Sequence, residues 1–200
     1  MFPIHKTQII LLLGLFIVTA CSVADQSVAT ITITAPPLPD LTELKVLPTP
    51  MPPSQTVVYE GFEVTMSQAE TTNSYQTEFN STREPPADTQ FLWIHLVLKN
   101  TSQQEQVLPE PEHFSVLNGR TEYKPIYGHW KHHTDYMALT TVIVQGQEVD
   151  AWLRFDIPAA LELSDLQFAF LPESSQVSLA FSPSAYPWGD HPIYLWTCAP

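Results

Sequence analysis

Residues 149–157 read VDAWLRFDI, and every second side chain in this stretch is apolar. In an extended chain, successive side chains point to opposite faces. The apolar set then lies on one face: Val149, Ala151, Leu153, Phe155 and Ile157. Asp150, Arg154 and Asp156 lie on the other face, together with Trp152. This period of two predicts a strand with Leu153 in a core and Arg154 in solvent, unless residues 124–137 cover that second face.

Further strand patterns lie on both sides of this stretch. Residues 90–99 (QFLWIHLVLK) are apolar on both faces, which is typical of a central strand covered on both sides. The remaining predicted strands cover residues 57–66, 73–79, 114–117, 139–144, 166–170, 176–181 and 192–197. Asn118-Gly119 predicts a tight hairpin, and only residues 109–113 and 158–164 suggest short helical turns. The sequence therefore predicts an all-β fold, an antiparallel β-sandwich of about 7–9 strands.

Parts of this predicted sandwich resemble a known family. They are residues 91–100, residues 114–119 with Tyr123, and Gly146 with residues 152–158. These segments resemble a bacterial immunoglobulin-like lipoprotein domain, often described only as a domain of unknown function and similar to a mycobacterial immunoprotective extracellular protein. The resemblance covers roughly the region from residue 56 to residue 170. It implies an immunoglobulin-like sandwich and brings no catalytic residues.

The N-terminus reads as a secretion signal. Residues 9–18 are mostly apolar and follow a short segment with one cation, Lys6. A membrane-spanning helix needs about 20 apolar residues, so this shorter run predicts the h-region of a signal peptide. Residues 18–21 (VTAC) resemble the bacterial lipobox, which implies a diacylglyceryl group on Cys21 and cleavage just before it. The alternative is an ordinary secretory signal cut near Ala20.

Composition divides the chain into three parts. Residues 1–20 are the predicted signal peptide, residues 21–55 the lipidated N-terminus with a tether, and residues 56–200 the sandwich domain. The tether holds seven prolines and no aromatic residue, so it buries too little apolar surface to fold. Proline-rich chains are extended and semi-rigid, so this segment should hold the domain away from the bilayer.

Charge and cysteine content limit the partners. The formal net charge is −13, with 8 Lys and Arg against 21 Asp and Glu. Nucleic-acid binding needs clustered basic residues, so nucleic acid is excluded as a partner. The membrane is expected as a partner only through the lipid anchor. Cys198 then has no intrachain partner and is predicted to be a small buried hydrophobe.

Residues 127–136 (YGHWKHHTDY) hold the densest set of reactive groups. His129, His132, His133 and Asp135 are donors of the kind that bind zinc or copper. A loop that folds them around one ion makes metal binding the second candidate function. The alternative is a solvated loop whose histidines point apart. No other cofactor is predicted, and His95, in an apolar strand, is expected to be a hydrogen-bonded core histidine.

No motif places a nucleophile beside a base, and no glycine-rich phosphate loop is present, so we do not predict an enzyme. Tyr127, Trp130 and Tyr136 are candidates for binding a protein or a glycan, because aromatic side chains supply stacking surface. The alternative is that they cap the ends of the sandwich. The first candidate function is therefore a non-catalytic binding or scaffolding role for a lipoprotein on the extracytoplasmic side of the bacterial cell envelope.

Overall fold

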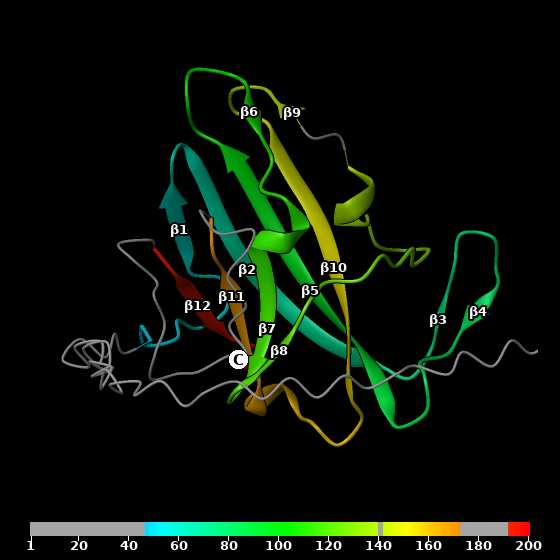
Figure 1. The fold of residues 1–200 in the computed structure, drawn as a ribbon. Helices are drawn as coiled ribbons and strands as arrows, with labels where there is room; N and C mark the ends of the chain where they lie inside the picture. The colour runs from blue at the N-terminus through cyan, green and yellow to red at the C-terminus, as the bar shows by residue number, and fades with distance from the viewer. Residues whose placement is uncertain (1–46, 140–141, 173–191) are drawn as a thin grey trace, which may run out of the picture. The chain divides into compact units, whose positions relative to one another are not determined.

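The computed structural model describes residues 47–139, 142–172 and 192–200 (Figure 1). The chain divides into two units, Met1–Leu38 and Pro39–Pro200, and every described residue belongs to the second unit. None of the helices in these described ranges is long and apolar enough to cross a membrane. The predicted signal peptide, Cys21 and the predicted strand over residues 176–181 lie outside the described residues.

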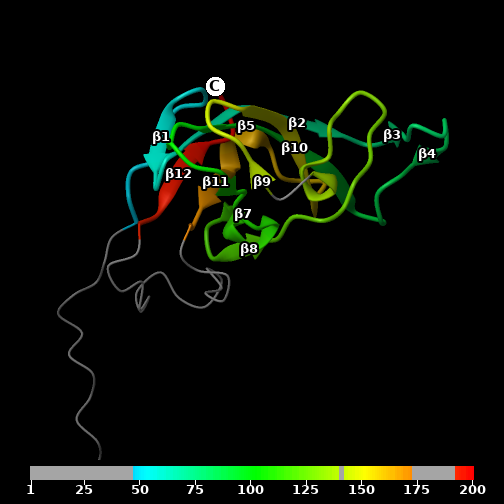
Figure 2. The same cartoon turned by 90° about the horizontal axis from the view of Figure 1, so that it is seen from above.

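Two four-stranded antiparallel sheets form the body of the domain. The first has the order β1-β2-β5-β10, with bounds Thr56–Tyr59, Phe62–Thr72, Thr89–Asn100 and Glu148–Pro158. The second has the order β12-β11-β7-β8, with bounds Tyr194–Thr197, Gln167–Phe170, Phe114–Asn118 and Thr121–Tyr123. Figure 2 shows the sheets as two layers. The predicted all-β antiparallel sandwich is confirmed.

Smaller elements lie outside the two sheets. The pair β3–β4 joins Tyr75–Gln76 to Thr82–Arg83, and the pair β6–β9 joins Gln106–Val107 to Val142–Ile143. Within the described residues, the short 3₁₀ turns are Pro111–His113, Tyr136–Ala138 and Leu163–Asp165. The first and third of these match the predicted helical turns. The strands predicted over residues 73–79 and 139–144 shorten to β3 and β9.

The core lies between the two sheets. Apolar side chains alternate inward along β5 and β10 and meet aromatic rings of the second sheet. Fully buried members are Leu92, Ile94, Leu96, Leu98, Ala151, Leu153, Phe155, Ile157, Phe114, Val116, Phe168, Phe170 and Trp196. The predicted alternation of β10 is therefore confirmed on its core side. Apolar burial of this kind, at about 25 cal/mol per Å², is the main stabilising term.

The outer face of the first sheet is covered as well. Trp93 on β5 is fully buried and Phe91 is 3% exposed, although both alternate with the core residues of that strand. Together with Tyr75 they form a second apolar cluster, against which Trp130 and Trp152 pack. A central strand covered on both faces is confirmed for this part of β5.

The single strand predicted over residues 57–66 is wrong, because a hairpin turn divides it into β1 and β2. Glu60 and Gly61 both have positive φ, 45° and 87°, the conformation that two-residue hairpin turns require. A Cβ on Gly61 would lie 2.7 Å from the Ser102 Cβ, so the turn also needs glycine for space. The buried side chains are Val57 in β1 and Phe62, Val64 and Met66 in β2, so the alternation changes from odd to even positions across the turn.

Part of the segment predicted as tether contacts the sandwich. Met51 pairs with Trp196 in a parallel bridge, and its N–H donates to the Leu195 carbonyl at 2.8 Å. The Trp196 indole Nε1 donates to the Gln55 carbonyl at 2.8 Å. Leu47 packs against a small apolar cluster of the second sheet. The contacts of the domain therefore reach back to residue 47.

Candidate functional site

Residues 124–137, which we call the insert, lie along the outer face of the first sheet. The Ile126 N–H donates to the Arg154 carbonyl at 2.7 Å, and the Trp152 N–H donates to the Thr134 carbonyl at 2.8 Å. Both partners are on β10, the edge strand of that sheet, so the insert uses the backbone groups of an open edge. The Lys131 N–H donates to the Gln76 carbonyl at 2.9 Å, which joins the insert to β3.

Asp135 holds the two ends of the insert together. Its carboxylate is 4% exposed and accepts hydrogen bonds from the N–H of Met137 at 2.9 Å and of Gly128 at 3.3 Å. Burial raises the pKa of Asp135, and these two hydrogen bonds oppose that rise. A Cβ on Gly128 would lie 2.6 Å from the Arg154 Cδ, so only glycine lets the insert backbone approach the sheet this closely.

Four aromatic rings lie in a row between the insert and the first sheet. Trp130 and His133 have centroids 4.0 Å apart, His133 and Trp152 also 4.0 Å, and Trp152 and His95 4.6 Å. The row alternates indole and imidazole, with two rings from the insert and two from the sheet. Trp93 meets the first two rings at an angle, at 5.1 and 5.5 Å. This packing fixes the insert on the sheet.

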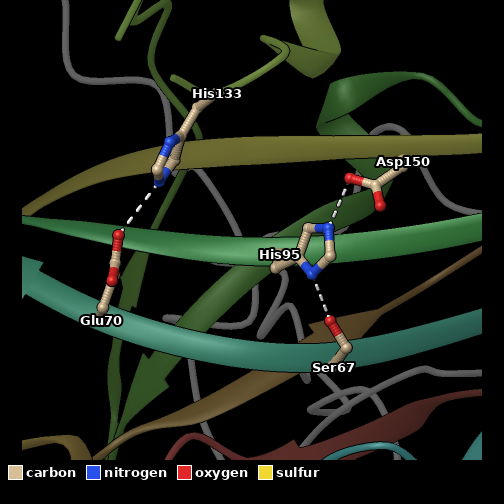
Figure 3. A network of polar contacts seen from close by, with 5 residues as sticks. All are labelled: Ser67, Glu70, His95, His133 and Asp150. Atoms are coloured by element: carbon tan, nitrogen blue, oxygen red, sulfur yellow. Dashed lines mark hydrogen bonds and ion pairs between the residues drawn. The ribbon is translucent and has the colours of Figure 1, made fainter. Parts of the chain in front are cut away.

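Three histidines pair with carboxylates at this face (Figure 3 shows two of the pairs). His133 Nε2 lies 3.0 Å from a Glu70 carboxylate oxygen, and His95 Nε2 lies 2.6 Å from Asp150 Oδ1. His129 Nε2 lies 2.9 Å from Glu78 Oε2. The His129 pair links the insert to the β3–β4 turn, and the His133 pair links it to β2. His95 is hydrogen-bonded as predicted, but it does not lie in the core, because its side chain is on the outer face of the sheet and is 18% exposed.

Ser67, His95 and Asp150 are joined in the order hydroxyl, imidazole, carboxylate (Figure 3). Such a series allows an imidazole to take a hydroxyl proton, as in serine hydrolases. In those enzymes the carboxylate is buried, whereas the Asp150 side chain is 67% exposed. Ser67 sits at a break in register between β2 and β5. We assign these three residues a structural role, in which their hydrogen bonds link β2, β5 and β10.

A cleft of about 430 Å³ opens between the insert and the β3–β4 hairpin. Its lining comprises Tyr75, Thr77, Glu78, Phe79, Ser81, Arg83, Glu84, Pro86, Phe91, Tyr127, His129, Arg154 and Asp156. This volume lies within the range of about 300–1,000 Å³ that is usual for ligand sites. Two of the lining aromatic residues are well exposed, Phe79 at 83% and Tyr127 at 56%. The cleft is therefore the candidate ligand site.

The prediction that Arg154 faces solvent is wrong, because this side chain lies on the inner wall of the cleft and is 13% exposed. Its Nη1 donates to the Tyr75 hydroxyl at 3.0 Å, and its guanidinium carbon lies 5.1 Å from the centroid of the Phe91 ring. Its Nε is 3.5 Å from Asp156 Oδ1. These contacts fix the guanidinium in one orientation.

The residues predicted as metal ligands do not come together. His129 and His133 each pair with a different glutamate, His132 is exposed, and Asp135 accepts backbone hydrogen bonds. Within the part of the chain that the structure describes, no group of three or more His, Cys, Asp or Glu side chains is arranged to hold a metal ion. Adjacent histidines point apart because the insert lies flat against the sheet.

The three predicted binding aromatics have different positions. Tyr127 lines the cleft, as expected for a ligand contact. Trp130 belongs to the stacked row, and Tyr136 is 4% exposed with its hydroxyl donating to the Pro109 carbonyl at 2.7 Å. Trp130 packs on the outer face of the first sheet and Tyr136 belongs to the core cluster, so both have packing roles that differ from the predicted capping of the sandwich ends. Cys198 is buried as predicted, and burial raises the pKa of its thiol to about 12.

The sequence analysis missed most of the cleft. Arg154 and Asp156 were assigned to a solvent face, and the residues of the β3–β4 hairpin were not considered as a site. Phe79 carried a usable signal, because a lone aromatic residue in a polar turn (TEFNST, residues 77–82) has no core to join.

Comparisons with known proteins agree with this fold. The sequence profile described as Domain of unknown function (DUF4352) matches residues 54–175. No curated protein matches the sequence. The structure is similar to the yjhA protein from Bacillus subtilis, with a TM-score of 0.50 and 12% identity over 74% of this chain and 98% of that one. An uncharacterized beta-sandwich protein from Clostridium difficile 630 has a TM-score of 0.48 and 12% identity over 76% and 95%. At this identity the first likeness shows the fold alone.

Proposed function

Because the chain belongs to the DUF4352 family, a domain family of unknown function, we propose its role from its own residues. The protein is a lipid-anchored, non-catalytic binding module of the bacterial cell envelope. Its ligand occupies the cleft between the insert and the β3–β4 hairpin. The domain faces the extracytoplasmic side.

The anchor rests on the N-terminal sequence. A short apolar run ends at Ala20, and Cys21 follows in the position that a lipobox requires. Two acyl chains, at about 0.8 kcal/mol per buried CH₂, hold a protein firmly to a bilayer, whereas one chain does not. Pro36, Pro37 and Pro39 precede the segment that contacts the sandwich, and prolines favour an extended connection between the anchor and the domain.

Cys21→Ala should move the protein out of the membrane fraction or leave it as an unprocessed precursor, because the thioether to the lipid is the proposed attachment. The measurement is membrane fractionation of cells, with protein mass used to follow processing. Ser22→Ala is the matched control and should behave like the wild type. If processed Cys21→Ala protein sediments with membranes as fully as the wild type, the anchor is not at Cys21.

The cleft carries the binding proposal. It combines a volume suited to a ligand with a half-buried arginine held in one orientation and two exposed aromatic side chains at its walls. Fixed polar groups beside apolar surface are the usual composition of ligand sites. Orienting the polar groups before binding lowers the entropy that binding costs.

A photo-cross-linking amino acid tests this assignment in intact cells. Benzoylphenylalanine in place of Tyr127 should give a covalent adduct on irradiation, because its ketone inserts into C–H bonds of any ligand in the cleft. The same amino acid in place of Val107, which is 65% exposed on β6, is the control and should give several-fold less adduct. Equal yields at the two positions, or none at position 127, would contradict the proposed ligand site.

A further inference from the structure

The chemical composition of the cleft points to one class of ligand. Its charged lining residues are Glu78, Glu84 and Asp156 against Arg83 and Arg154, with His129 beside them. The two signs nearly balance, so the cleft does not select a strongly charged ligand. A phosphate-rich or polyacidic ligand needs an excess of Arg and Lys, which is absent from this lining.

Two pairs of polar side chains are already formed in the cleft. His129 and Glu78 meet at 2.9 Å across the opening between insert and hairpin, and Arg154 and Asp156 meet at 3.5 Å on the inner wall. The first pair sets a hydrogen-bond donor next to an acceptor, whereas Arg154 Nε and Asp156 Oδ1 are buried and form no hydrogen bond within the described residues. Neighbouring sugar hydroxyls match this arrangement, because each hydroxyl both donates and accepts.

The exposed aromatic side chains supply the apolar half of such a site. Phe79 comes from the β3–β4 turn and Tyr127 from the insert, so each belongs to a different wall of the cleft. The face of an aromatic ring is electron-rich and packs well against polarised C–H groups. A pyranose ring with equatorial substituents presents a flat face of axial C–H groups on each side. Such a ring is the ligand shape that stacks on aromatic walls.

We infer that the cleft binds a neutral glycan of pyranose rings with equatorial substituents, with pyranose faces against Phe79 and Tyr127 and hydroxyls bonded by Glu78, His129 and Arg154. This inference rests on the proposed ligand site and adds the class of ligand to it. Arg154 is fixed by Tyr75 and Phe91 before the glycan arrives, so its donors are oriented in advance.

Calorimetric titration of the full chain, purified in detergent, tests the inference with cellohexaose and chitohexaose as probes. At least one of the two should bind, and Tyr127→Ala and Phe79→Ala should each weaken that binding by about tenfold or more. Val107→Ala, exposed on β6, is the matched control and should leave the affinity unchanged. A trigalacturonate probe, which is anionic, should bind more weakly than the neutral sugars.

Three results would overturn the inference. They are absence of binding by both neutral hexasaccharides, tighter binding of trigalacturonate, and affinity that does not change in Tyr127→Ala and Phe79→Ala. The cross-linking experiment separates this failure from failure of the proposed function. If position 127 captures a protein while neither hexasaccharide binds, the cleft is a ligand site for a peptide and not for a glycan. If position 127 captures nothing and neither sugar binds, both the site and the glycan are wrong.

Discussion

Trp93→Ala should lower the free energy of unfolding by about 3–5 kcal/mol, as removal of a fully buried aromatic side chain does. Trp93 is 0% exposed and lies under the insert, in contact with Tyr75, Trp130 and His133. The substitution leaves a cavity between the sheet and the insert, so it should loosen the insert as well. Urea unfolding followed by circular dichroism measures the cost.

Trp93→Phe is the matched control for this prediction. The indole Nε1 of Trp93 is buried with no hydrogen-bond partner in the described part of the chain, so phenylalanine loses no hydrogen bond there. Trp93→Phe should lower the free energy of unfolding by about half as much as Trp93→Ala, because most of the ring volume remains. A cost below about 0.5 kcal/mol for Trp93→Ala, the size typical of surface positions, would mean that the insert does not cover this face.

Leu153→Ala should cost about 2–5 kcal/mol, through lost apolar burial and the cavity left behind. Leu153 is 0% exposed, pairs with Ile94 across β10 and β5, and belongs to the core between the sheets. Glu148→Ala is the control on the same strand and should change the free energy of unfolding by about 0.5 kcal/mol or less, because Glu148 is exposed. Equal costs at positions 153 and 148 would contradict the assigned faces of β10.

Large losses in the free energy of unfolding for both Trp93→Ala and Leu153→Ala would show that the first sheet is buried on two faces. The alternation in residues 149–157 predicted a single buried face, since aspartate and arginine normally face water. The apolar run over residues 90–99 did predict two covered faces for its own strand. Both predictions came from neighbours in sequence, and such local patterns determine which side chains share a face.

The ligand cleft could not be predicted in the same way, because its contacts join residues far apart in the chain. Tyr75 and Arg154, which both line the cleft, are 79 positions apart. The four candidate metal ligands are close together in the sequence but separate in the fold, because His133 pairs with Glu70 on β2, His129 pairs with Glu78 in the β3–β4 turn, Asp135 accepts backbone hydrogen bonds and His132 is exposed. The hairpin at Glu60 and Gly61 was missed, although the buried positions change from odd numbers in β1 to even numbers in β2.

The central claim is that the insert is fixed on the first sheet and thereby forms one wall of a ligand cleft. Amide hydrogen exchange tests it most directly, at the N–H groups of Ile126, Lys131 and Trp152, whose hydrogen bonds join the insert to its neighbours. We predict that all three exchange at least about a hundredfold more slowly than in an unstructured peptide. Exchange of these amides at the unstructured rate, while the amides of β5 stay protected, would show an insert free of the sheet and would contradict the account.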